Sequence, residues 1–368
     1  MTEIYILDKN FKTIGLVDGF TSLIWRRKYI GNGEYELHLP GGELFELIQS
    51  GKYLYRADTK EAALIERVQY LRENNGGRKV VAAGRFLEAL LSERVIYQIT
   101  EISGNAEAAI RGLVAINAIS GTAEEGREIA GLTLGETNNV GGEISQQLNG
   151  ENLLEAIETI CTEQEIAIKV ELDFLRNAMV FSVWQGKDRT TAQRVNSWAI
   201  FSDDFENINA SGYERDIHDY KNIAYVHGQK EDESEIIVEV DNRETENEER
   251  KEIFVDAISA RQKTEEKTLT DNEFIELLKQ KGLEALAEYP LIEAVEGDVR
   301  DGGNLVYRKD FDLGDLCEYV DNEIGVEAVG RITEVVEYIE GGKTEISATL
   351  GDAGRSFVKK IIRRESSK

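Results

Sequence analysis

The chain has 368 residues, which is too many for one ordinary hydrophobic core and favours two or three domains. Its 70 acidic residues outnumber the 43 basic ones, so the formal net charge is −27 and the surface should repel free DNA and anionic membranes. The two cysteines, Cys161 and Cys317, stand far apart and outside any CxxC pattern, so they support neither a disulfide framework nor a thiolate metal site.

Residues 1–102 have the pattern of short strands separated by turn residues. Between residues 35 and 39 apolar side chains alternate with polar ones, as in a strand with one buried face, and the Gly-Asn-Gly sequence just before them favours a turn. A long hairpin is expected from Ala63 to Ala83, with its turn at residues 74–77. Repeated antiparallel pairing of this kind predicts a first β-barrel domain.

The spacing becomes helical in the middle of the chain. Apolar side chains recur at intervals of three and four over residues 110–117 and 153–161, which predicts two amphipathic helices. The segments 166–172 and 179–184 then alternate and predict the two arms of a hairpin. We therefore expect an α/β insertion domain over residues 103–200.

The β pattern returns in residues 201–354, which we expect to form a second β-barrel domain. Residues 223–226 and 236–240 are its first predicted strand cores. The stretch 231–252 carries eleven acids against three bases. We interpret it as a solvated hairpin with its turn, and cation or partner binding is the alternative.

One helix and one long hairpin complete this region. Thr270 and Glu273 have the spacing of a capping box, which predicts a helix over about 271–289. Residues 329–350 predict a hairpin that turns at Gly341-Gly342, and its outline is similar to that of the first hairpin. Duplication of one barrel is therefore a hypothesis. The predicted fold class is mainly β with an α+β insertion, in which two antiparallel β-barrel-like domains flank an α/β domain.

The chain has few histidines, which nucleophilic and metal-assisted catalysis commonly require. Its three histidines, His38, His218 and His227, lie outside any metal-ligand spacing. Two of them have aspartates nearby, but polar positions in a strand and its loop explain them more simply. Residues 341–344 resemble the end of a phosphate-binding loop, yet a strand pattern follows instead of a helix. No catalytic, cofactor-binding or metal-ligating residue and no cofactor is predicted.

Residues 355–368 are predicted to form a basic C-terminal tail on an otherwise acidic chain. Docking on an acidic neighbouring subunit, binding to nucleic acid or a membrane, and a solvated end are the alternatives for this tail. The candidate subunit-interface residues are Arg355, Phe357, Val358, Lys359, Lys360, Ile361 and Ile362.

Short motifs at both ends of the chain point to a known family. They are Tyr5-Ile6-Leu7-Asp8, Ile14-Gly15-Leu16-Val17-Asp18, the segments 22–29 and 33–40, Phe311-Asp312-Leu313-Gly314-Asp315 and Gly330-Arg331-Ile332-Thr333-Glu334. With these motifs the chain resembles siphovirus tail proteins of the ReqiPepy type and, more distantly, the baseplate-hub and tail-associated proteins of contractile phages.

The resemblance implies a structural protein and not an enzyme. In the hub family two related barrels per subunit form a ring, in which three subunits join the tail tube to the spike or tip. It implies a homotrimer or hexameric ring that contacts the tube, distal-tail and spike or tip proteins. From the acidic composition we infer that DNA passes through such a ring without specific binding. The N-terminus lacks the basic segment followed by an apolar segment that a signal peptide has, so no signal peptide is expected. The sequence also lacks a run of about 20 apolar residues, so no membrane span is expected. The expected location is the virion tail, after assembly in the bacterial host cytoplasm.

Two other functions stay open. A tail-associated peptidoglycan hydrolase would use aspartate or glutamate residues as acid and base. A host-surface carbohydrate-binding module would use Trp25, Trp184 and Trp198 as stacking faces, although tryptophans are more often part of a core.

Overall fold

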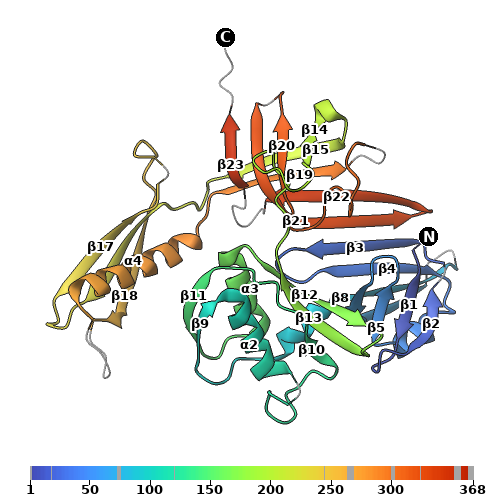
Figure 1. The fold of residues 1–368 in the computed structure, drawn as a ribbon. Coiled ribbons are helices and arrows are strands. Elements are labelled where there is room, and N and C mark those ends of the chain that lie inside the picture. Colours follow the sequence, from blue (N-terminus) through green and yellow to red (C-terminus); the bar gives the residue numbers. More distant parts are fainter. Residues whose placement is uncertain are drawn as a thin grey trace. The chain divides into compact units, whose positions relative to one another are not determined.

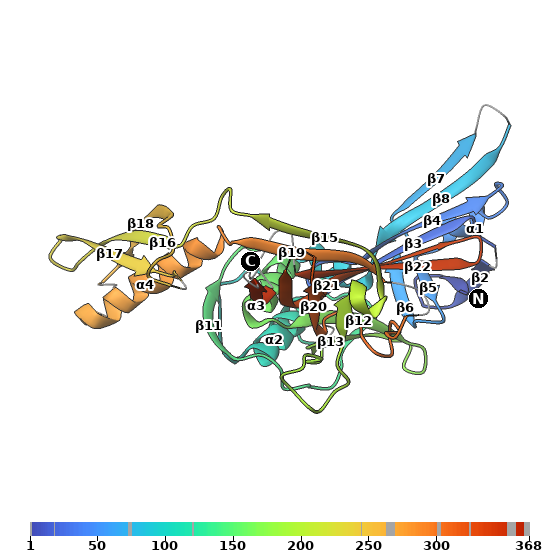
Figure 2. The same cartoon turned by 90° about the horizontal axis from the view of Figure 1, so that it is seen from above.

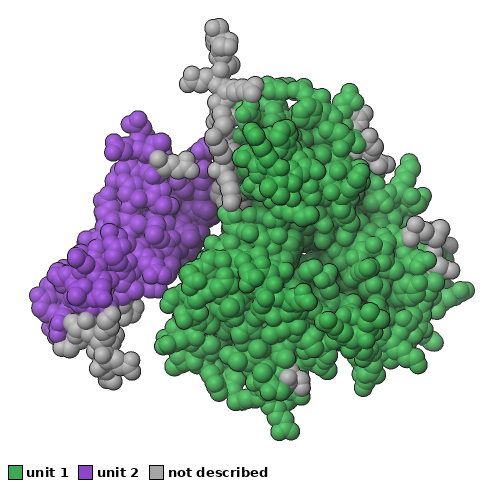
Figure 3. All heavy atoms as spheres, viewed as in Figure 1, with its two compact units in different colours: residues 1–211, 296–350, 360–368 green, residues 212–295, 351–359 purple. Residues whose placement is uncertain are grey.

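The computed structural model describes residues 2–17, 19–72, 76–119, 121–243, 245–262, 269–299, 303–323, 325–351 and 358–363. The chain forms two compact units, which Figure 3 shows in different colours. Unit 1 comprises residues 1–211, 296–350 and 360–368, and unit 2 comprises residues 212–295 and 351–359. Strands dominate unit 1, and unit 2 combines a small sheet with one helix (Figure 1).

The main sheet of unit 1 joins the two ends of the sequence. Its strand order is β15-β19-β22-β21-β3-β4-β8-β7, with β20 and β23 also paired to β21 and β14 paired to β20. The bounds are β3 Ser22–Lys28, β4 Glu34–Pro40, β7 Arg67–Arg72, β8 Arg78–Arg85, β14 Ile200–Ser202, β15 Ile208–Asp216, β19 Ile292–Val299, β20 Leu316–Asp321, β21 Val326–Glu340, β22 Lys343–Gly351 and β23 Val358–Arg363. The β21–β22 hairpin turns at Gly341-Gly342, as predicted.

A second, four-stranded sheet packs against part of the main sheet. Its order is β2-β1-β5-β6, and all three pairings are antiparallel. The two sheets share one apolar core, in which Trp25 is fully buried. The bounds are β1 Ile4–Leu7, β2 Thr13–Val17, β5 Tyr53–Arg56 and β6 Glu61–Leu64, and a short helix α1 spans Phe45–Ser50.

The prediction of a mainly β fold is confirmed, but in the described part of the chain no closed barrel is found. The arm predicted as one strand from Ala63 to Arg72 is in fact two strands, β6 and β7, which belong to different sheets. The chain changes sheets at Ile65-Glu66, and the early strands therefore form two facing layers with open edges. Figure 2 shows how far β7 and β8 extend as a hairpin.

Gly84 in β8 allows the crossing between these two layers. A Cβ atom at this position would lie only 1.9 Å from the carbonyl oxygen of Leu64. Backbone atoms cannot move aside as a flexible side chain can, so only glycine fits here.

The two predicted helices of the insertion are confirmed. Asn105 and Asn152 cap their N-termini by accepting hydrogen bonds from backbone amides. The predicted hairpin is also confirmed as β12 and β13, with β10 parallel to β13. The bounds are α2 Ala106–Ala118, α3 Leu153–Gln164, β9 Thr100–Asn105, β10 Leu132–Leu134, β11 Glu143–Leu148, β12 Ala167–Asp173 and β13 Ala178–Trp184, with 3-10 helices η1 Leu87–Glu93 and η2 Asp203–Phe205.

Unit 2 is a two-layer structure of three strands and one helix. The central strand β16 (Ile223–Gln229) pairs antiparallel with β17 (Glu235–Asp241) and parallel with β18 (Glu252–Arg261). The helix α4 (Asp271–Ala287) begins with the predicted capping box of Thr270 and Glu273. Its residues Phe274, Leu278 and Leu286 pack against one face of the sheet.

The predicted domain boundaries at 102, 200 and 354 remain a prediction. The compact units have other boundaries, and β3 pairs with β21 although these strands were assigned to different barrels.

Replacing Gly84 by alanine should reduce the free energy of unfolding by on the order of 3 kcal/mol, because the new methyl group meets backbone atoms. Gly112, in the exposed part of α2, has open space around its Cβ position and provides the control. Gly112→Ala should stabilise the protein by about 0.5–1 kcal/mol. Urea unfolding of both variants tests this, and equal effects would contradict the proposed close approach.

Candidate functional site

The segment 311–315, which carries one of the family-like motifs, lies where distant parts of unit 1 meet. Phe311 is fully buried and packs edge-on against Phe201, with 5.0 Å between the ring centroids. Asp315 accepts hydrogen bonds from the Lys187 backbone N–H at 2.8 Å and from Arg189 Nε at 2.5 Å. The segment thus connects β20 to the chain that follows β13.

Two glycines allow this meeting of backbones. A Cβ atom on Gly186 would lie 1.8 Å from the carbonyl oxygen of Gly314. Gly314 itself has a φ of +81°, and its own Cβ would lie 2.5 Å from the ring of Tyr29. Arg331 Nη1 donates to that same carbonyl oxygen at 2.6 Å. The glycine of the motif is therefore required by the shape of the backbone.

Beside this segment lies a connected series of seven charges, which we call the charge row. Its members alternate in sign and come from β3, β5, the turn between β5 and β6, β6, the loop before β20 and β21. In order they are Asp58, Arg56, Glu337, Arg308, Glu61, Arg27 and Asp312. The successive pairs are separated by 2.9, 2.6, 3.0, 3.1, 2.7 and 2.6 Å.

The most deeply buried pair of the charge row is Arg56–Glu337. Both side chains are only 4% exposed, and they are 281 positions apart in the sequence. Burial alone would lower the pKa of Arg56, but Asp58 and Glu337 more than offset this effect and raise it. The guanidinium also lies 5.6 Å from the ring centroid of Trp25.

Glu61 is held as a carboxylate by three donors. It contacts Arg27 and Arg308, and Trp25 Nε1 donates to it at 2.7 Å. Burial alone would raise its pKa, yet the two guanidinium groups keep the pKa below its ordinary value. The pKa of Arg27 is likewise raised, because Glu61 and its other partners outweigh its burial.

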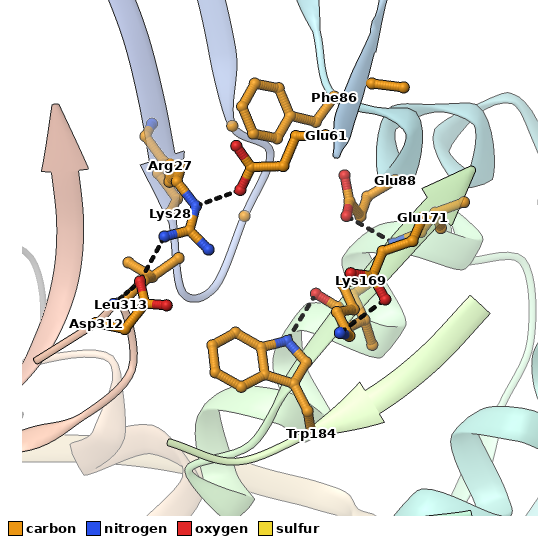
Figure 4. Close-up of a pocket in the computed structure, with 15 residues that line it drawn as sticks. Arg27, Lys28, Glu61, Phe86, Glu88, Lys169, Glu171, Trp184, Asp312 and Leu313 are labelled. Atoms are coloured by element: carbon orange, nitrogen blue, oxygen red, sulfur yellow. Dashed lines mark hydrogen bonds and ion pairs between the residues drawn. The ribbon is translucent and has the colours of Figure 1, made fainter. Parts of the chain in front are cut away.

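A cavity of about 270 Å³ lies next to the charge row. Figure 4 shows Arg27, Glu61 and Asp312 on one side of it, and Glu88, Lys169 and Glu171 on the other. The charges of the row pair with one another and thereby hold strands of unit 1 together. Lys169 and Glu171 also form a pair, at 2.7 Å.

Glu88 differs from the other carboxylates of the cavity. One of its oxygens accepts a hydrogen bond from the Val170 backbone N–H at 2.8 Å. The other oxygen is buried and, within the described structure, has no hydrogen-bond partner. Burial raises the pKa of Glu88 to about 7.

The structure gives no metal centre in the residues that it describes. Among them, no group of three or more His, Cys, Asp or Glu side chains is placed to hold an ion. His227 lies 3.5 Å from Glu235 and 3.7 Å from Asp256, and His218 is exposed near Asp219. In the same part of the chain, no helix is long and apolar enough to cross a membrane.

The three tryptophans have different surroundings. Trp25 is fully buried in the core, so it is not a surface stacking face. Trp184 packs edge-on against Tyr29, with 5.1 Å between centroids. Trp198 is 53% exposed, and its indole N–H donates to the Gln193 carbonyl oxygen.

The predicted interface residues of the C-terminal tail are only partly covered. Arg355 and Phe357 lie outside the described residues. Strand β23, which pairs with β21, contains Val358, Lys359, Lys360, Ile361 and Ile362. Their role in a subunit interface stays a prediction.

Sequence reasoning missed the charge row, although one signal was present. In β21 the inward side chains are Val335, Glu337 and Ile339. An acid at an inward position of a strand requires a buried partner of opposite charge. The alternation therefore indicated a partner for Glu337, but it could not identify Arg56.

Replacing Glu337 by glutamine should reduce the free energy of unfolding by about 3–5 kcal/mol, because Arg56 and Arg308 lose their shared buried carboxylate. The control is Glu34→Gln, which removes a carboxylate paired with Arg26 at the surface. It should cost less than about 1 kcal/mol. Urea unfolding measures both, and similar losses would refute the central role of Glu337.

Replacing Glu88 by glutamine should change how stability depends on pH. Between its unfolded pKa near 4.5 and its folded pKa of about 7, the folded state keeps a proton that the unfolded chain has released. Stability from this group therefore falls as pH rises through that window, by about 3 kcal/mol.

The variant lacks this loss, so its stability relative to the natural protein should increase from pH 5 to pH 8. Unfolding in urea at several pH values measures the difference. A difference that stays constant with pH would show that Glu88 has an ordinary pKa.

A comparison with known proteins places the chain in a family. Residues 3–352 match the family described as siphovirus ReqiPepy6 Gp37-like protein. Among curated proteins, none matches the chain.

Solved structures of phage-type tail proteins have a similar fold. A tail protein from Neisseria meningitidis has a TM-score of 0.57 at 15% identity, covering 97% of both chains. The 43 kDa tail protein of prophage MuSo2 from Shewanella oneidensis has a TM-score of 0.58 at 11% identity, covering 95% of this chain and 97% of that one. The prophage tail protein gp18 from Listeria monocytogenes has a TM-score of 0.54 at 11% identity, covering 94% of both chains. The chain therefore belongs to the siphovirus ReqiPepy6 Gp37-like protein family, and its fold is one found in phage and prophage tail proteins.

Proposed function

We propose that the chain is a structural subunit of a phage or prophage tail, in the baseplate hub or distal-tail ring that connects the tail tube to the tip or spike. The observation that carries this proposal is the family match over residues 3–352, together with a fold shared over nearly the whole length of tail proteins. Its location would be the virion tail, after assembly in the bacterial host cytoplasm.

The chemistry of unit 1 supports a mechanical function. The charge row and the segment 311–315 fasten strands from the beginning, middle and end of the sequence. Breaking one buried partner would leave an uncompensated charge, so these contacts resist separation of the strands. A subunit that stays rigid in this way suits a ring that connects other tail proteins.

The net charge supports the same proposal. With −27 per chain, a ring of three or six copies would surround its channel with negative potential. DNA would then pass without specific binding, because its phosphates are repelled. The partners of the ring would be copies of this chain and other tail proteins of the tube, distal tail, spike or tip.

One observation favours the alternative function, a peptidoglycan hydrolase. Glu88 is a carboxyl at a cavity with a pKa of about 7, as expected of a general acid. Glu61, on the far side of the cavity, is engaged by two arginines and Trp25, which leaves it poorly suited to act as base or nucleophile. Cell-wall turnover that is lost in Glu88→Gln would favour the hydrolase.

Light scattering across a concentration and salt series tests the ring proposal. We expect a mass three or six times that of one chain. A variant that ends at residue 354 lacks the basic tail and should have a lower mass if the tail forms the subunit interface. A persistent monomer that binds neither tube nor tip proteins would contradict the proposed function.

A further inference from the structure

Unit 2 leaves one face of its sheet uncovered by its own helix. Figure 1 shows α4 lying along the β16–β18 sheet. Inward side chains such as Ala224, Val226 and Val240 pack against this helix. Because side chains alternate along a strand, their neighbours in sequence point to the opposite face. We call that surface the open face.

The open face is more apolar than a solvated sheet surface should be. When one face of a sheet is covered and the other faces water, side chains alternate between apolar on the covered face and polar on the wet face. Here Ile237 is 59% exposed, Phe254 is 60% exposed and Ile258 is 38% exposed. These side chains come from β17 and β18, on either side of the central strand.

The strand register gathers these side chains into one patch. Ile237 lies opposite His227, and Phe254 lies opposite Tyr225 on the other side of the same strand. The rings of His227 and Phe254 have centroids 6.0 Å apart. The patch therefore crosses all three strands, and unit 2 has two layers where a third would fit.

The rim of the patch carries negative charge. The rim carboxylates are Glu235, Glu239, Glu252 and Asp256, all at outward positions. Arg250 contacts Glu239 at 3.3 Å and Glu252 at 3.1 Å, and it donates to the Tyr225 hydroxyl at 2.7 Å. The other two rim carboxylates, Glu235 and Asp256, lie 3.5 and 3.7 Å from the ring nitrogens of His227. Acidic groups thus outnumber the one arginine at the rim, and the rim attracts positive charge.

We propose that the open face binds a segment of a different tail protein that combines apolar side chains with lysine or arginine. Phe254 would be the central anchor, and the rim carboxylates would pair with the basic residues. A second copy of this chain is a poor occupant of the open face, because its own basic segment, in β23, already pairs with β21.

This inference rests on the proposed tail function, and it assigns a partner to the acidic stretch 231–252. A photo-crosslinking residue at position 254 in assembled tail particles provides the test. Position 175 is the control, because Leu175 is fully exposed in unit 1. Crosslinked peptides are identified by mass spectrometry.

We expect crosslinks from position 254 to an apolar, Lys- or Arg-rich segment of another tail protein, and none to that segment from position 175. The double variant Ile237→Ser, Phe254→Ser should reduce recovery of that protein with the particle by about tenfold or more. Leu175→Ser should leave the recovery unchanged. Both replaced side chains are exposed, so circular dichroism should show normal folding.

Two results would overturn the inference alone. One is a crosslink from position 254 to residues 355–368 of another copy, which would make the open face a contact between identical subunits. The other is the presence of the chain in the particles without crosslinks above the control. Absence of the chain from the particles would instead overturn the proposed tail function, and the inference with it.

Discussion

The buried pair Arg56–Glu337 is the interaction on which the assembly of unit 1 depends. Neither charge can be left alone in the interior, since each would lose its hydration without compensation. The pair therefore requires β5 and β21, which lie far apart in sequence, to come together in one arrangement. Apolar side chains of similar volume could stabilise the core as well, but they would tolerate shifted arrangements that this pair excludes.

Neighbouring contacts extend this constraint to the rest of unit 1. Arg308 connects Glu337 to Glu61, and Arg27 connects Glu61 to the segment 311–315. From there, Asp315 reaches the chain beyond β13. The two sheets and the segment that follows β13 are thus linked through charged side chains as well as through apolar packing. Pockets beside such a network are a consequence of bringing many irregular segments together, and a cavity alone does not indicate catalysis.

Local features of the fold could be predicted from the sequence, and long-range ones could not. The helix α4 begins at its capping box, and its apolar stripe faces the sheet, because both signals lie within one stretch of chain. The change of sheet at Ile65-Glu66 has no glycine or proline to mark it, so β6 and β7 were predicted as one arm. The glycine that permits the change, Gly84, lies in the following strand.

The same limit applies to the candidate site. The motif at 311–315 was found from its resemblance to a family, but its contacts with Lys187 and Arg189 depend on the tertiary fold. In the sequence Glu88 cannot be told from an exposed acid. Its pKa is raised because the fold buries it beside Val170 in β12. The alternation of apolar and polar residues along a strand cannot show which charges pair across more than a hundred residues, because each buried charge has many possible partners in the sequence.

The way in which unit 2 is attached to the main sheet allows it to change during evolution. β15 and β19 are neighbours in the main sheet, so the segment between them leaves and returns at adjacent points. A module attached in this way can be gained, lost or exchanged by recombination without changing the order of the strands that support it. Related chains could therefore differ most in this segment and acquire new attachment partners while the framework around the charge row is inherited intact.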